Sequence, residues 1–119
     1  MEGLSIRQSF FKEKDTRINL RLRSMEFNEF IEKWNTFLGK QPFEKVMMYK
    51  VLLGAWAVML FKESIRTEDK DIAVMLIAIA VDNLAVAKEI YDDLIRKGYK
   101  GRVQEIFDIV VRNLGLEHG

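Results

Sequence analysis

Three carboxylates that fall within one helical turn are the side chains of this sequence best suited to chemistry. They are Glu89, Asp92 and Asp93, and Asp82 stands two turns earlier on the same face of a continuous helix. Carboxylates grouped in this way can bind Mg²⁺ or polarise a water molecule. Basic residues stand among them at helical pairing distances, which is typical of a solvated, charged face: Lys88, Arg96 and Lys97. We therefore assign no catalytic, metal-binding or cofactor-binding residue.

Other catalytic patterns are missing from the 119 residues. The sequence has no glycine-rich phosphate loop, no paired-histidine zinc motif and no serine nucleophile motif. It has no cysteine, and its one histidine, His118, stands next to the C-terminus. These absences exclude thiolate and most histidine-based schemes, so we expect a protein that is not an enzyme and has no cofactor.

A basic segment raises a different function. In RINLRLR, four polar residues alternate with apolar ones in the period of a strand: Arg17, Asn19, Arg21 and Arg23. The apolar residues also fit one face of a helix, so both conformations stay open. Arginine and asparagine are suited to guanine, adenine and phosphate. These four residues are the candidate nucleic-acid contacts.

The order of elements around this segment resembles the ribbon-helix-helix repressors. RINLRLR is followed by FNEFIEKWNTFLGK and then by a helix that opens at Pro42, so the resemblance covers about residues 17–53. It implies paired strands from two chains whose outward residues read the major groove of DNA. The turn Gly39-Lys40-Gln41-Pro42 and the strongly apolar second helix depart from that family. A DNA-binding regulator is the alternative function.

Two charged residues stand alone among apolar neighbours. Lys50 is flanked by apolar or small residues three and four positions away, and so is Asp82. As a buried polar pair they would join two helices and fix their register. The alternative is that each reaches water independently.

The elements that position these residues are helices. Amphipathic spacing or capping signals predict helices at 5–14, from Ser24 to Gly39, from Pro42 to about Ser64, from a Thr67 cap to Lys97, and from Arg102 to Leu114. No linker divides them. We expect one all-α domain over residues 1–119, a compact bundle of four to five helices.

Two apolar stretches, Val51–Phe61 and Ile72–Val81, are too short to cross a bilayer, which needs about 20 residues. A straight helix from Thr67 to Lys97 would be about 45 Å long, more than a domain of this size can enclose. It therefore either breaks near Asp82-Asn83 or projects and packs on something else.

On the side of that helix that should face water, the middle has no polar residues. We therefore expect a partner to bury this surface, and a second copy of the chain is the simplest partner. We expect an intertwined or helix-exchanged homodimer formed by residues 46–61 and 72–87. Its interface residues are Met75, Ala78, Ala85, Val86, Gly54 and Ala57. The predicted function is self-association, with a further protein partner unknown.

The composition narrows the setting. Nineteen basic residues oppose eighteen acidic ones, so no net charge draws the chain to nucleic acid or lipid. The lack of cysteine and of an apolar leader fits a cytoplasmic protein, and the use of Lys, Glu, Arg and Ile is thermophile-like. The overall texture resembles uncharacterised archaeal all-helical proteins that form intertwined dimers. That resemblance implies no known activity.

Overall fold

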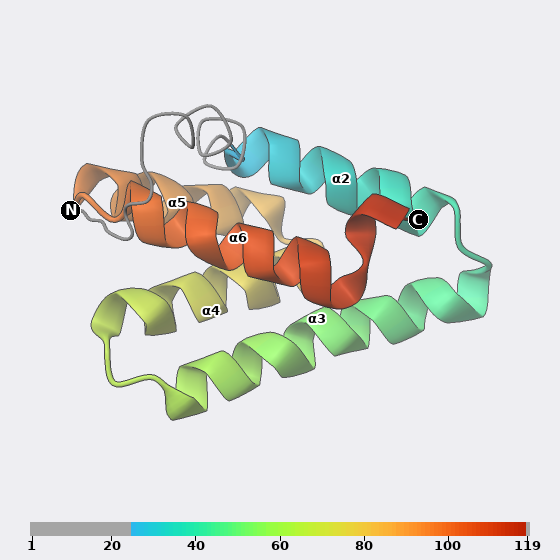
Figure 1. Cartoon of the computed structure of the whole chain (residues 1–119), viewed down its shortest axis with the longest axis horizontal. Helices are drawn as coiled ribbons and strands as arrows, with labels where there is room; N and C mark the ends of the chain where they lie inside the picture. The colour runs from blue at the N-terminus through green and yellow to red at the C-terminus, as the bar shows by residue number, and fades with distance from the viewer. Residues whose placement is uncertain (1–24, 119) are drawn as a thin grey trace, which may run out of the picture.

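The computed structural model describes residues 25–118, which form five α-helices and a short 3-10 helix, with no strand among them (Figure 1). The elements are α2 (Phe27–Gly39), α3 (Phe43–Glu63), α4 (Thr67–Ala80), α5 (Leu84–Arg96), α6 (Lys100–Leu114) and η1 (Leu116–His118). The predicted all-α bundle is confirmed. The expected helix at 5–14 and the segment 17–23 lie outside the described residues.

The helix boundaries differ slightly from those the sequence predicts. α2 begins at Phe27 with Glu26 in the capping position, two residues beyond the expected cap at Ser24. Thr67 is the first residue of α4 and Arg66 precedes it as the cap. α6 begins at Lys100, earlier than the predicted Arg102. No side chain makes a capping hydrogen bond at these three starts, so backbone hydrogen bonds set them, and apolar spacing does not record those bonds.

The expected long helix breaks at Asp82-Asn83, so the first of the two alternatives is correct. Asp82 has a left-handed backbone with φ of 65°. Asn83 then caps α5, because its side chain accepts a hydrogen bond from the Val86 N–H at 3.3 Å. Aspartate tolerates a positive φ better than most residues do, so this pair of residues ends one helix and starts the next.

The core forms around α4. Five of its side chains are completely buried: Ile72, Ala73, Met75, Leu76 and Ile79. α4 contacts α3, α5 and α6, and this is why it is apolar on almost every side. α3 lies along one edge of the bundle and packs mainly against α4 (Figure 1).

Aromatic side chains join α2 to the rest of the bundle. Phe30 stacks on Phe107 of α6, with ring centroids 4.3 Å apart, and Phe27 packs against Tyr91 of α5 at 5.2 Å. Phe37 meets Tyr49 of α3 edge to face at 4.7 Å. Rings in these arrangements contribute about 0.5–1.5 kcal/mol each beyond the apolar area they bury. α2 is therefore held to three helices by its aromatic face.

Candidate interaction surface

α3 is apolar around most of its circumference, yet most of it lies on the surface. Only Leu53 and Ala57 of its 21 residues are buried. Eight large apolar side chains are exposed, by fractions from 41% for Phe61 to 78% for Phe43. We call these eight residues together with Ala55 the α3 face: Phe43, Met47, Met48, Val51, Leu52, Ala55, Val58, Met59 and Phe61. A helix that is apolar all round is normally buried, yet no helix among residues 25–118 covers the α3 face.

The size of the α3 face is unusual for the surface of a single chain. Taking about 150–200 Å² for a whole large apolar side chain, the exposed fractions leave roughly 600–800 Å² of apolar surface open on α3. The largest apolar patch of an ordinary soluble monomer measures about 300–600 Å². A stable protein–protein interface buries about 800 Å² on each partner. The α3 face therefore has the area of an interface.

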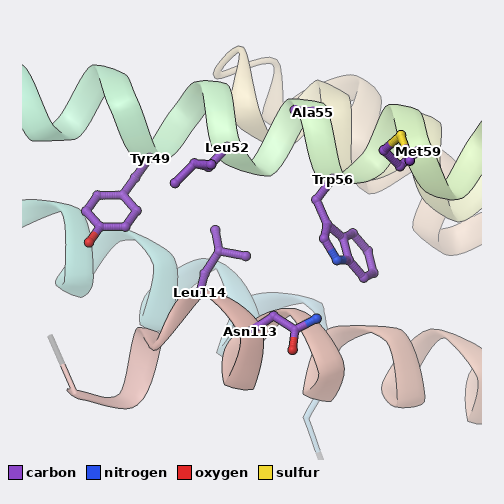
Figure 2. Close-up of a pocket in the computed structure, with 7 residues that line it drawn as sticks. All are labelled: Tyr49, Leu52, Ala55, Trp56, Met59, Asn113 and Leu114. Atoms are coloured by element: carbon purple, nitrogen blue, oxygen red, sulfur yellow. The ribbon is translucent and has the colours of Figure 1, made fainter.

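A groove of 450 Å³ follows one flank of this face, between α3 and the C-terminal end of α6. Figure 2 shows Tyr49, Leu52 and Trp56 extending from α3 toward Leu114 and Asn113 of α6. Aliphatic and aromatic side chains form most of its walls. The phenol, the indole N–H and the Asn113 amide supply the polar groups.

A second groove, of 680 Å³, follows the opposite flank of α3. Val51 and Val58 line it from α3, and Ile77 and Ala80 line it from α4. The α4–α5 turn closes it at Val81, which is itself 66% exposed. The apolar surface of α3 thus continues onto the end of α4.

Ala55 lies between the two grooves and lines both of them. At about 100° per residue, Val51 and Ala55 fall at the centre of the exposed half of α3. Gly54 is half-buried, and a Cβ atom added to it would meet the Ala80 Cβ at 4.0 Å. The middle of the α3 face therefore consists of Val51 and the small Ala55, with larger apolar residues on both sides.

Lys50 and Asp82 form the ion pair that the sequence suggests, with Lys50 Nζ 2.7 Å from Asp82 Oδ2. The pair joins α3 to the α4–α5 turn at the wall of the second groove. The expectation of burial is wrong, because the Asp82 side chain is 67% exposed and that of Lys50 is 24% exposed. Asp82 sits in a turn rather than inside a helix, and the turn carries it out of the core.

The six predicted interface residues do not share one surface of the chain. Met75, Ala78 and Ala57 are buried by the chain's own helices, Gly54 is half-buried, and Ala85 and Val86 are exposed on α5. For the residues within 72–87, the expectation that they need a second copy to cover them assumed one straight helix over 67–97, on which they would line the water-facing side. Since the helix breaks, α5 folds back against α4, and α4 is covered within the bundle. Contact of these residues with a second copy stays a prediction.

Three of the four carboxylates considered for chemistry, Asp82, Asp92 and Asp93, are paired with bases. Lys88 Nζ lies 2.8 Å from Asp92, while Arg96 and Lys97 lie 2.6 and 2.8 Å from Asp93. The hydrogen bond from Lys97 is the main cause that lowers the pKa of Asp93. Over residues 25–118, no group of three or more His, Asp or Glu side chains is arranged to hold a metal ion. These residues form the charged, solvated face that their spacing indicates.

Sequence reasoning missed the pairing of Asp69 with Arg102. Asp69 is 4% exposed and receives two hydrogen bonds of 2.8 Å from the Arg102 guanidinium and one of 3.2 Å from the Ser64 hydroxyl. The Arg102 hydrogen bonds hold the pKa of Asp69 below its ordinary value. In the sequence Asp69 looks like one of several acids in a first helical turn, and nothing marks a partner on α6. The pair links the N-terminal ends of α4 and α6.

None of the helices between Met25 and His118 combines the length and the apolar character needed to cross a membrane. The four candidate nucleic-acid contacts, Arg17, Asn19, Arg21 and Arg23, precede the described residues, so the ribbon-helix-helix alternative stays a prediction. Comparisons of this chain with protein-family models, with curated proteins and with solved structures found no match.

Proposed function

We propose that this chain is a self-association module in which the α3 face docks against the α3 face of a second copy. The observation that carries the proposal is the exposure of eight large apolar side chains on one helix at the edge of the bundle. Covering them removes apolar surface from water, which contributes about 25 cal/mol for each Å² buried. The proposal places the contact on α3 and the adjoining end of α4, and it does not use the buried residues Met75, Ala78 and Ala57.

A second copy is a suitable occupant because the surface is close to neutral and continuous. Lys50 is the one charged residue of α3 between Val46 and Phe61, and it is paired with Asp82 within its own chain. A partner that used an acidic or basic surface to bind the α3 face would have its charged groups desolvated, and the α3 face has no opposite charges to pair with them. A second α3 face brings no such charges. A homodimer through one patch used twice is also the commonest symmetric assembly.

Replacing Val51 by lysine tests the proposed surface. Val51 is 66% exposed, and full burial of a valine side chain contributes about 1.5–3 kcal/mol, so each copy loses about 1–2 kcal/mol of association energy. Two copies per dimer give about 2–4 kcal/mol, or about 30- to 1,000-fold weaker association. Val74→Lys, on the exposed side of α4 outside both grooves, is the matched control and leaves association unchanged.

Sedimentation velocity across a range of micromolar concentrations measures whether each protein is a single chain or a dimer. The unaltered chain and Val74→Lys should sediment as a species twice the 14.0 kDa mass of one chain, and Val51→Lys as a single chain. A 14.0 kDa species for the unaltered chain throughout the range would overturn the proposal. So would a dimer that Val51→Lys leaves intact. Binding of a single-chain species to phospholipid vesicles would assign the α3 face to a membrane surface instead.

A further inference from the structure

The charges at the two ends of α3 specify how two copies would be oriented. The N-terminal turn carries Glu44 followed by Lys45, and the C-terminal turn carries Lys62 followed by Glu63. All four residues are exposed. At about 100° per residue, Glu44 and Lys62 share one azimuth near the centre of the exposed half, and Lys45 and Glu63 share another at its edge. Each azimuth therefore has opposite charges at its two ends.

We infer that two copies pair through antiparallel α3 helices that cross at Gly54 and Ala55. This inference rests on the proposed self-association and specifies its geometry. Around a two-fold axis, residues equally far from the crossing point face each other. In the antiparallel arrangement, Glu44 of each copy faces Lys62 of the other, and Lys45 faces Glu63. In a parallel arrangement Glu44 and Lys62, which lie near the centre of the exposed half, each face their own copy, so like charges meet at both ends, which is unfavourable.

The position of the crossing follows from two independent features. The midpoint of Glu44 and Lys62 is position 53, and the midpoint of Lys45 and Glu63 is position 54. The small exposed residue of the α3 face is Ala55, directly after the half-buried Gly54. Small side chains at a crossing allow the two helix axes to approach to about 8 Å. The crossing point given by the charge pattern and the one given by the small residues thus differ by at most two residues.

The charge pairs also select the crossing angle. The charged ends lie about 14 Å along the helix from the crossing, at about 1.5 Å per residue. Helices that cross at about 20° place those ends about 5 Å apart sideways, within reach of lysine and glutamate side chains. At about 50° the ends lie about 12 Å apart and cannot meet. The shallow class of helix packing therefore fits the α3 face.

Engineered cysteines test the orientation, because the chain has none of its own. Val51 and Val58 are both exposed and stand on opposite sides of the crossing, with a midpoint between Gly54 and Ala55. In the antiparallel pair, Val51 of one copy faces Val58 of the other. Cysteines at facing positions of this kind fall within the Cα separation of about 4.4–6.8 Å that a disulfide needs.

The experiment uses the variants Val51→Cys and Val58→Cys. Each variant is oxidised mildly on its own, and so is a mixed sample in which the two variants have been unfolded and refolded together. Asn35→Cys, exposed on α2, is the control for random collision. The expected result is a covalent dimer in the mixed sample that forms about ten-fold or more faster than in either single variant. Covalent dimers formed by each variant alone would overturn the antiparallel arrangement in favour of the parallel one.

Sedimentation of the same variants under reducing conditions separates the inference from the proposed function. A dimer that gives no covalent product in any sample overturns the orientation while self-association stands. A single-chain species in every reduced sample overturns the proposed function itself. A dimer that becomes covalent in the mixed sample alone supports both.

Discussion

Replacement of Arg102 by methionine should destabilise the fold strongly, because it leaves the Asp69 carboxylate buried without its cation. Arg102→Met removes both 2.8 Å hydrogen bonds and keeps the Ser64 hydroxyl at 3.2 Å as the remaining side-chain donor. Breaking a buried ion pair in this way costs about 3–5 kcal/mol. The Arg102 side chain is 29% exposed, so water reaches part of the vacated space and the lower value, about 3 kcal/mol, is expected.

The dependence of this loss on pH has a defined sign. The pKa of Asp69 is lowered in the folded chain, first by the Arg102 hydrogen bonds, from an ordinary value of 3.8. The stabilisation that the ionised carboxylate gives is therefore complete above about pH 4 and is lost as the pH falls through the lowered, folded-state pKa. In Arg102→Met the guanidinium is gone and burial raises the pKa of Asp69 instead. Asp69 of the variant is then protonated as the pH falls through this raised pKa. The difference in unfolding free energy between the two proteins therefore begins to shrink above about pH 4 and continues to shrink down to the lowered pKa of the unaltered chain.

Urea unfolding followed by far-UV circular dichroism, at one protein concentration and at several pH values from about 7 to 3, measures both effects. Arg112→Met is the matched control on the same helix. Arg112 lies 3.0 Å from Asp108, with side chains 66% and 32% exposed, so its loss should cost less than about 1 kcal/mol. A loss below about 1 kcal/mol for Arg102→Met, or a difference that stays constant on acidification, would refute the reasoning.

Three further substitutions test single backbone features by thermal unfolding. Gly115→Ala should destabilise the chain by about 1 kcal/mol, because Gly115 ends α6 in a left-handed conformation with φ of 69°. Gly101→Ala, inside α6 with no atom within 4 Å of the added Cβ, should instead stabilise it by about 0.5–1 kcal/mol. If both alanines shift the midpoint in the same direction, the assignment of the helix end is wrong. Asn83→Ala should cost about 1 kcal/mol through loss of the cap on Val86 N–H, and an unchanged midpoint would show that the cap contributes nothing.

Local signals allowed much of the helical framework to be predicted. The apolar spacing before Gly39 and the proline at position 42 locate α2 and α3 to within a few residues. Asp82-Asn83 marks the break between α4 and α5, because both residue types favour turns and caps and both interrupt an apolar run. The same contrast between a lone charge and its apolar neighbours singles out Lys50 and Asp82, whose side chains lie 2.7 Å apart.

The parts that could not be predicted depend on contacts between distant residues. Helical periodicity treats 67–97 as one straight rod, so it placed Met75 and Ala78 on a water-facing stripe, whereas both are buried and α4 is exposed at Val74. Asp69 and Arg102 are 33 positions apart, and neither has a neighbour that marks it as half of a pair. The apolar character of α3 was visible in the sequence. Which side of α3 lies open depends on where α4 and α6 pack, and that side defines the α3 face.

The contact between Lys50 and Asp82 has a consequence for how the second groove receives an occupant. One wall of that groove is the α4–α5 turn, which its own backbone holds through Asn83 N–H to Ala78 O at 2.8 Å. The ion pair between Lys50 and Asp82 links the same turn to α3, which forms the opposite wall. The groove is therefore preorganised, and an occupant can bind without the loss of entropy that ordering a loop would cause. A groove of fixed width favours ligands that already match its shape over ligands that require it to remodel.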